Sequence, residues 1–289
     1  MRVMKSRRDP LGIIAGEGEL PVLIARGMKA AGHRVCCVGL RGHYHPQLPS
    51  ACDAFQTAGV ARMSRWIRLL RRQQVREAVM VGRVSKARMH EPWKLVRHVI
   101  GLVPDLRALR LWYRHLRYDR RNAALLAAVA DELARSGITL IDSTTHIPDQ
   151  LATRGIMGRV QLTSEQQADI DFGWPLMVQA VELDIGQAIA VRERDVIAVE
   201  AVEGTDAMID RAGQLCKAKG WTLLKTAKRE HDMRADVPVI GVETIQRVAK
   251  AGGRCIALGA GRVILIDKLA VLAAADAAGV AVVGVGASA

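Results

Sequence analysis

The chain has 289 residues, of which 50% are hydrophobic and 25% are charged. That length suits two domains of ordinary size, and that composition excludes a disordered protein. Five scattered cysteines, an odd number, exclude a disulfide framework and favour a reducing cytoplasm. No run of 18 apolar residues occurs, and no signal-peptide core follows the charged first ten residues. The sequence therefore predicts a cytoplasmic protein that does not span a membrane.

Positive charge is concentrated in one block of the first half. The net charge is +13, and between Arg62 and Arg121 17 basic residues stand against four acidic ones, so this block carries the whole excess. Such a block predicts an acidic partner, although a solvated helix face explains the arginines from Arg62 to Arg76 equally well. The cationic, amphipathic stretch from Arg110 to Tyr118 is typical of a segment that lies on an anionic membrane surface. The absence of a helix-turn-helix, RNA-binding or zinc-finger pattern argues against specific nucleic-acid recognition.

The first half alternates short apolar runs with helical stretches. Its predicted elements, in chain order, are a strand over 11–15, a helix over 21–32, strands over 34–40 and 78–81, a helix over 123–135 and a strand over 138–142. Strands that alternate with helices at this spacing indicate an α/β fold with a parallel sheet covered by helices. We assign this first domain to residues 8–147.

The second half begins after a break in the pattern. Residues 148–164 contain Pro148, Gly155 and Gly158 without a sustained apolar period, and we interpret them as a linker. The elements predicted beyond it are a helix over 165–183, a hairpin of strands over 187–191 and 195–201, a helix over 205–212, and strands over 222–225, 239–242, 255–257, 263–266 and 280–285. Residues 165–289 are therefore predicted to form a mixed α/β domain.

Two glycine-containing turns follow strands of the first domain. The turn Gly16-Glu17-Gly18-Glu19-Leu20-Pro21 opens a helix, so its backbone N–H groups can approach an anion at the helix N-terminus. It lacks the third glycine of the dinucleotide fingerprint and a Walker lysine. A second turn places Arg83, Ser85 and Lys86 after the strand over 78–81, where ligands of doubly wound sheets bind. A plain strand-to-helix connection and a solvated loop are the alternatives for these two turns.

Acidic residues gather where a strand of the second domain gives way to a helix through Gly204. Glu203 and Asp206 flank this turn and could bind Mg²⁺, which favours one or two carboxylates together with phosphate oxygens. The alternative is that Thr205 or Asp206 caps the helix, while Glu200 points to solvent.

Cations and one carboxylate follow the strand over 222–225. Lys225, Lys228 and Arg234 suit the oxygens of a diphosphate, and Asp236 could hold a metal or orient a water. Phosphoryl transfer needs this combination of charge neutralisation and a positioned nucleophile. A surface loop of salt bridges has the same composition and is the alternative.

In chain order, these segments resemble the LpxI-type UDP-2,3-diacylglucosamine pyrophosphatases of bacterial lipid A biosynthesis. Six blocks carry the resemblance across about 250 residues: 12–21, 82–86, 184–187, 199–208, 225–228 and 234–241, the last followed by Thr244-Ile245 and by Gly259-Ala260-Gly261 before Asp267. Any single block is a weak signal, whereas their order is specific.

The resemblance implies an N-terminal Rossmann-like domain, a C-terminal α/β domain and a site for an acylated UDP-sugar between them. It implies Mg²⁺-dependent hydrolysis to UMP and 2,3-diacylglucosamine 1-phosphate by a homodimer at the cytoplasmic membrane surface. On this reading Asp236 and Asp206 are catalytic and, with Glu203, bind the metal. The implied substrate-binding residues are Gly16, Gly18, Leu20, Pro21, Arg83, Ser85, Gln187, Thr205, Lys225, Lys228 and Arg234. The rival interpretation is a non-catalytic protein that binds an anionic acylated sugar phosphate or nucleotide.

Overall fold

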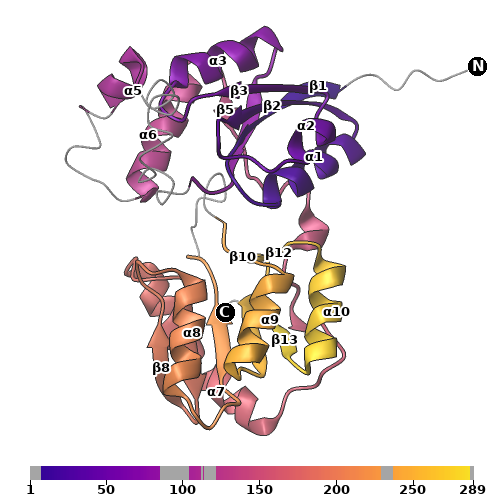
Figure 1. Cartoon of the computed structure of the whole chain (residues 1–289), viewed down its shortest axis with the longest axis vertical. Helices are drawn as coiled ribbons and strands as arrows, with labels where there is room; N and C mark the ends of the chain where they lie inside the picture. The colour runs from indigo at the N-terminus through magenta and orange to yellow at the C-terminus, as the bar shows by residue number, and fades with distance from the viewer. Residues whose placement is uncertain (1–7, 85–103, 112, 114–121, 229–236, 287–289) are drawn as a thin grey trace, which may run out of the picture. The chain divides into compact units, whose positions relative to one another are not determined.

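The computed structural model describes residues 8–84, 104–111, 113, 122–228 and 237–286 (Figure 1). The chain divides after Ile147 into two compact units, which we treat one at a time. Among the helices of these ranges, none is both long enough and apolar enough to cross a membrane.

The first unit contains a five-stranded parallel sheet. Its strands are β1 (Arg8–Ala15), β2 (His33–Leu40), β3 (Ala54–Ala58), β4 (Glu77–Val81) and β5 (Thr139–Leu140). They lie in the order β3-β2-β1-β4-β5, so the direction of winding reverses between β1 and β4. This order is typical of a Rossmann-like fold, and it confirms the predicted parallel α/β class. Strand β3 was not predicted, because its five residues carry no sustained apolar pattern.

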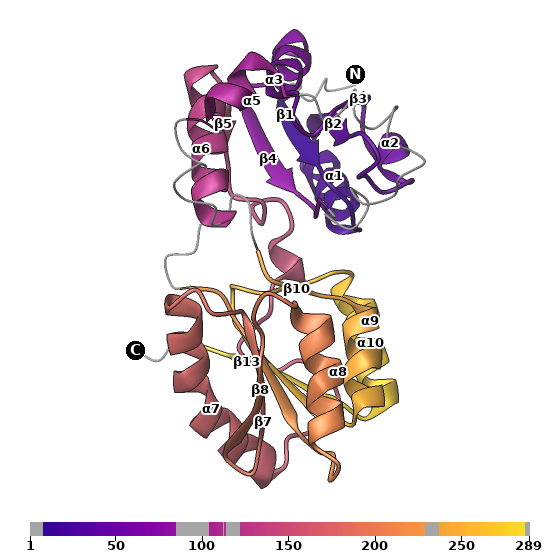
Figure 2. The ribbon, with the colours of Figure 1, turned by 60° about the vertical axis from the view of Figure 1, so that its left-hand side comes forward.

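Helices cover both faces of this sheet (Figure 2). They are α1 (Leu20–Ala30), α2 (Leu48–Ala51), α3 (Met63–Arg72), α5 (Leu106–Leu111) and α6 (Asn122–Arg135). Helices α3 and α6 share one apolar core with Ile14 of β1, while the neighbouring Ile13 points to the opposite face. Helix α3 buries Trp66 and Leu70 and exposes Arg65 and Arg68. These two arginines of the basic block therefore form a solvated helix face.

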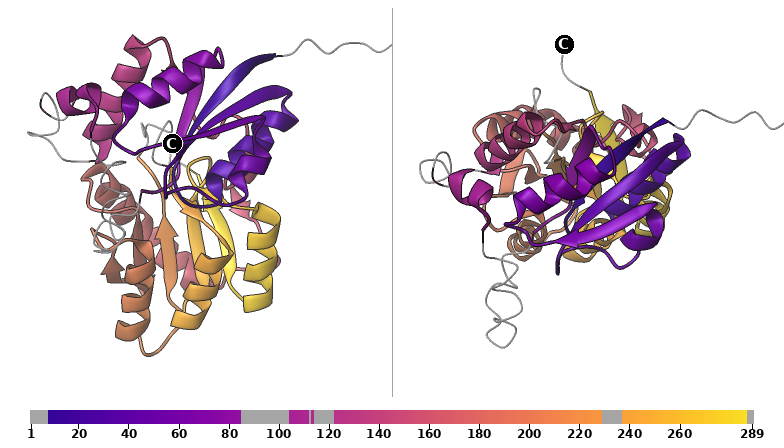
Figure 3. Two further views of the ribbon diagram at one scale, coloured as in Figure 1. Left: turned by 45° about the horizontal axis from the view of Figure 1, so that its top comes forward. Right: turned by 90° about the horizontal axis from the view of Figure 1, so that it is seen from above.

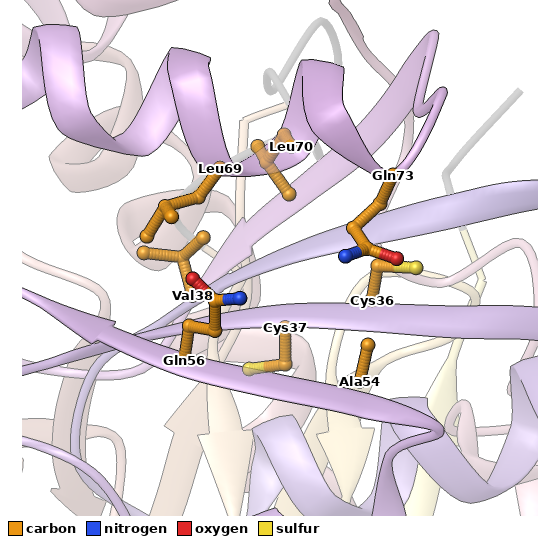
Figure 4. A pocket seen from close by; sticks show the side chains of 8 residues that line it. All are labelled: Cys36, Cys37, Val38, Ala54, Gln56, Leu69, Leu70 and Gln73. Carbon is orange, nitrogen blue, oxygen red and sulfur yellow. The ribbon is translucent and has the colours of Figure 1, made fainter.

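A small pocket lies between α3 and strands β2 and β3 (Figure 4). Its lining residues are Cys36, Cys37, Val38, Ala54, Gln56, Leu69, Leu70 and Gln73. The cavity volume of about 10 Å³ holds about one water molecule, so this pocket is too small for an organic ligand.

The second unit is built on a six-stranded mixed sheet. Its strands are β6 (Gly155–Ile156), β7 (Ala188–Arg192), β8 (Asp195–Val199), β9 (Thr222–Lys225), β11 (Cys255–Gly259) and β13 (Ala281–Val285). They lie in the order β6-β13-β11-β9-β7-β8, in which β9, β11 and β13 are parallel and β6 and β7 run antiparallel to their neighbours. A separate parallel pair joins β10 (Val239–Ile240) to β12 (Ile264–Leu265). The mixed α/β class predicted for this half is confirmed.

Two apolar cores lie on the two faces of the six-stranded sheet. Helix α7 (Ser164–Glu182) covers one face, while α8 (Thr205–Leu215), α9 (Val242–Ala251) and α10 (Lys268–Ala278) cover the other, with α9 and α10 side by side (Figure 3). Successive side chains of β9 point to opposite faces and show which helices cover each face. Leu223 packs under α8 and α9, whereas Leu224 packs under α7. Residues two apart along a strand of this sheet therefore share a face and a core.

The segment 148–164, which we expected to form a linker, belongs to the second unit, and its last residue already begins α7. It contains the 3-10 helix Pro148–Gln150 and strand β6, which pairs antiparallel with β13. The Ala152 N–H donates to the Val263 carbonyl at 2.9 Å, and the Gly261 N–H donates to the Ala152 carbonyl at 2.8 Å. The glycines that broke the apolar pattern thus belong to a segment that covers an edge of the sheet.

The cysteines should differ in their reactivity toward iodoacetamide at pH 8. Burial raises the pKa of the Cys255 thiol to about 12, while a hydrogen bond from Cys37 lowers the pKa of the half-buried Cys52. Because the thiolate is the reactive form, Cys52 should be alkylated before Cys255, as measured by peptide mass spectrometry. In urea, where the difference in burial is lost, Cys52 and Cys255 should be alkylated at equal rates. Equal rates in the native protein would contradict the described burial.

Candidate active site

A row of three residues crosses adjacent strands at one end of the second unit's sheet. Ala188 of β7 is paired with Lys225 of β9, and on its other side its carbonyl accepts a 2.8 Å hydrogen bond from the N–H of Glu200, which follows β8. Leu223 and Ala198, two residues before Lys225 and Glu200, both belong to the core under α8. The pleat therefore directs the side chains of Lys225 and Glu200 to the same helix-covered face.

Thr205, the first residue of α8, joins these two charged side chains. The Lys225 ammonium donates to Thr205 Oγ1 at 2.8 Å, and the Thr205 hydroxyl donates to Glu200 Oε1 at 2.9 Å. Lys225 is 5% exposed and Glu200 is 8% exposed. The second carboxylate oxygen, Glu200 Oε2, is buried and has no hydrogen-bond partner among the described residues. A charged chain of hydrogen bonds is thus enclosed where β8 and β9 end and α8 begins.

The beginning of α8 differs from the two alternatives considered from sequence. Its N-cap is Gly204 at φ 85°, a conformation that favours glycine, and no side chain caps the helix. The alternative that Thr205 or Asp206 caps α8 is therefore wrong, because the Thr205 hydroxyl donates its hydrogen bond to Glu200 instead. The expectation that Glu200 faces solvent is also wrong, because α8 covers that face of the strand.

The carboxylates proposed as metal ligands have separate surroundings. Glu203 accepts hydrogen bonds from Arg211 at 2.7 Å and from the Ala201 N–H at 3.1 Å. Asp206 is more open, with a 62% exposed side chain and the Arg247 guanidinium 3.9 Å away. Within the ranges that the structure describes, no three His, Cys, Asp or Glu side chains come together to form a metal site. Arg234 and Asp236 lie outside the described residues.

Other predicted residues of the second unit lie around the same end of its sheet. Lys228 forms a 2.7 Å ion pair with Asp184, and the Gln187 carbonyl accepts from the Thr226 N–H at 3.1 Å. A side chain at Gly186 would collide with the Glu200 carbonyl, so glycine allows the turn before β7 to approach Glu200. The predicted residues Gln187, Thr205, Lys225 and Lys228 therefore come from segments that the sheet brings together.

In the first unit, the loops that follow β1 and β4 cross at the point where the strand order reverses. A Cβ atom on Gly16 would lie 2.6 Å from the Arg83 carbonyl oxygen, and one on Gly82, at φ 95°, would lie 2.6 Å from the Gly16 carbonyl carbon. The two loops are also paired, since the Glu17 N–H donates to the Arg83 carbonyl at 2.8 Å and the Arg83 N–H donates back at 3.0 Å. Ligands of doubly wound sheets bind at this position.

The glycine turn leaves donors at the start of α1. The Gly16 and Glu17 N–H groups are used within the crossing, whereas those of Gly18 and Leu20 have no acceptor in the described part of the chain. Pro21 is buried near the N-terminus of α1, so these free N–H groups suit an anion. The Arg83 side chain is exposed, and Ser85 lies outside the described residues.

Sequence reasoning missed a hydrogen-bonded side-chain pair, His43 and Glu17, at this turn. His43, 6% exposed and just beyond β2, has its Nδ1 2.8 Å from Glu17 Oε1. The available signal was position, because β1 and β2 are parallel neighbours and their following loops must share an edge. The pair gives the glycine turn a second anchor besides Arg83.

Comparisons with known proteins agree over both units. The chain matches the LpxI N-terminal domain over residues 10–150 and the LpxI C-terminal domain over residues 153–283. It is 34% identical over 283 residues to the UDP-2,3-diacylglucosamine pyrophosphatase LpxI of Caulobacter vibrioides, covering 95% of this chain and 97% of that protein. Among solved structures, the biotin carboxylase domain of a single-chain bacterial carboxylase shows 16% identity over 72% of this chain and 55% of that one. The TM-score of this match is 0.22.

Replacing Gly82 with alanine should destabilise the first unit more than the same change at Gly32. Both glycines have positive φ, but only Gly82 faces a neighbouring backbone, because nothing lies within 4 Å of a Cβ on Gly32. We expect a loss of about 3 kcal/mol for Gly82→Ala and about 1 kcal/mol for Gly32→Ala in the free energy of unfolding. Calorimetry would measure both, and equal losses would contradict the close crossing.

Proposed function

The chain belongs to the LpxI family, and from this premise we propose that it hydrolyses UDP-2,3-diacylglucosamine to UMP and 2,3-diacylglucosamine 1-phosphate in lipid A biosynthesis. The activity is named for a relative that is 34% identical over almost the whole chain. The structural observation that carries the proposal is the enclosed Lys225 ammonium beside the start of α8. A buried cation at that position matches a diphosphate ligand.

The side chains around Lys225 provide what a diphosphate requires. An ammonium group neutralises phosphate oxygens, and the N-terminus of a helix adds unpaired N–H groups and a favourable dipole. Lys228 lies three residues further along the chain. Its side chain is paired with Asp184 and is partly exposed. In phosphoryl transfer such groups stabilise the charge that develops on the leaving phosphate. Lys225 and the α8 N-terminus are therefore assigned to binding the diphosphate, with Lys228 and Arg234 in support.

We assign the catalytic carboxylate to Asp236 and a Mg²⁺ ligand role to Asp236 and Asp206. The exposed Asp206 side chain fits that role, because Mg²⁺ binds through few carboxylates and completes its shell with waters and phosphate oxygens. Glu203 fits less well, since its carboxylate is held by Arg211. Bound Mg²⁺ would supply charge neutralisation at the phosphate oxygens. Asp236 would orient the water that attacks phosphorus.

A membrane-surface location is part of the proposal. Helix α5 exposes Leu106 and Leu109, and Tyr113, which follows the helix, is exposed as well, with exposed fractions of 82%, 48% and 61%. Arg110 is exposed between Leu109 and Tyr113. Exposed apolar side chains with an adjoining cation suit the boundary between headgroups and acyl chains, where an acylated substrate resides. A homodimer is proposed on the resemblance alone.

The substitution Asp236→Ala should abolish UMP release while leaving substrate binding intact. The change removes the group that orients water but leaves Lys225, Lys228 and Arg234, the side-chain cations that bind the diphosphate. UMP release from UDP-2,3-diacylglucosamine in mixed micelles, with Mg²⁺ and with EDTA, measures the first effect, and retention of labelled substrate measures the second. Asp195→Ala, at the exposed first residue of β8, is the matched control. Turnover at the wild-type rate in Asp236→Ala would refute the catalytic assignment, and EDTA-resistant turnover would refute the Mg²⁺ assignment.

Neutralising Lys225 should impair turnover more than neutralising Lys228. Lys225 is enclosed, where water screens its charge little, whereas Lys228 is partly exposed and already paired. We expect Lys225→Met to lower kcat/KM by about 100-fold and Lys228→Met by about 10-fold, in the same UMP-release assay. The reverse order would place the diphosphate away from Lys225.

A further inference from the structure

We propose that Glu200 is a positioning residue for the diphosphate site, which holds the Lys225 ammonium in place through the Thr205 hydroxyl. The inference rests on the proposed function and adds a residue to it, because Glu200 was expected to be solvent-exposed and nothing in its sequence motif assigns it a role. Glu200 does not contact the ligand in this scheme.

The first argument is the direction of the hydrogen bonds. A threonine hydroxyl has one proton, and Thr205 donates it to Glu200 Oε1 at 2.9 Å. Its lone pairs are thereby turned toward Lys225, whose ammonium donates to Thr205 Oγ1 at 2.8 Å. Without an acceptor at position 200 the hydroxyl is free to rotate, and its proton then competes with Lys225 for the same space. Glu200 therefore sets the orientation on which the Lys225 contact depends.

The second argument is the cost of placing a carboxylate at this position. Glu200 is 8% exposed and its Oε2 is buried without a partner in the described ranges, an arrangement that lowers stability. The same face of the neighbouring strands is filled by alanines, Ala188, Ala190 and Ala198. A small apolar residue would thus satisfy the packing here. A buried carboxylate that packing does not require is explained by its effect on Thr205 and Lys225.

The third argument is that the backbone is adapted to keep Glu200 in place. The Glu200 N–H donates to Ala188 at 2.8 Å, which extends the ladder between β7 and β8 by one residue. Gly186 leaves room for the Glu200 carbonyl, with which any side chain would collide. Gly204 then reverses the chain at φ 85° so that Thr205 begins α8 within reach of the carboxylate.

Two pairs of variants test the hydrogen-bond chain. Glu200→Ala and Thr205→Val remove a link, whereas Glu200→Gln retains the Oε1 acceptor and Thr205→Ser retains the hydroxyl. In the UMP-release assay we expect the first pair to lose about 10- to 100-fold in kcat/KM and the second pair to stay within about threefold of wild type. Glu193→Gln, at the exposed β7–β8 hairpin, is the control for loss of a carboxylate.

Rescue by the conservative variants separates this role from a merely structural one. Equal losses in Glu200→Gln and Glu200→Ala would overturn the proposal, as would turnover at the wild-type rate in Glu200→Ala. If Glu200→Ala does not fold, Thr205→Val decides, because valine is close to threonine in shape and removes only the hydroxyl.

An NMR measurement tests the same chain without turnover. In protein labelled with ¹⁵N-lysine, the hydrogen-bonded Lys225 ammonium should give a slowly exchanging signal, assigned by its absence in Lys225→Met. The signal should persist in Glu200→Gln and Thr205→Ser and disappear in Glu200→Ala and Thr205→Val, with binding of inorganic pyrophosphate weakened by about 10-fold in the latter two. An unchanged signal and unchanged pyrophosphate affinity in those two variants would overturn the Glu200 proposal. Wild-type protein without hydrolase activity would overturn the proposed function instead.

Discussion

The candidate site of the second unit depends on one hydroxyl group, that of Thr205, between a buried cation and a buried carboxylate. Enclosing either charge alone would be strongly unfavourable, and the hydroxyl links the two at 2.8 and 2.9 Å. Much of the local architecture serves this contact. The antiparallel β7 places Lys225 and Glu200 on either side of Ala188. Gly204, the N-cap of α8, begins the helix where the Thr205 hydroxyl reaches both side chains. The site is therefore a property of three strands and one helix terminus together.

The two units offer anions different kinds of donor. In the second unit the donor is a side-chain ammonium whose position is set by other side chains. In the first unit it is the backbone, since the N–H groups of Gly18 and Leu20 at the start of α1 lack acceptors among the described residues. Backbone donors are uncharged and need no counterion, which suits a turn built from glycines and proline.

Periodicity and turn chemistry predicted most of the fold. The bounds of β9 were predicted as they are observed, and the alternation of β strands with helices predicted the parallel sheet of the first unit. The segment 148–164 was predicted to be a linker because local composition cannot show that a strand of two residues covers a sheet edge. Glu200 was misjudged for a related reason. A period of two shows which residues share a face, but only the later packing of α8 decides that this face is buried. Lys225 and Thr205 were both among the predicted site residues, yet their direct contact, and the hydrogen bond of Thr205 to Glu200, depend on strand pairings that the sequence does not reveal.

Because their backbones cross closely at Gly16 and Gly82, the loop after β1 and the loop after β4 are expected to move together. Two backbone hydrogen bonds join Glu17 to Arg83, and His43 ties the same turn to the loop after β2. A force applied to one loop is thus transmitted to the others without a change in side-chain packing. The same contacts constrain the lengths of the two loops in evolution. An insertion in either loop would move Gly16 and Gly82 apart and break the hydrogen bonds between Glu17 and Arg83. Three segments that are far apart in the sequence are therefore expected to diverge together, whereas the exposed arginines of α3 are free to vary one by one.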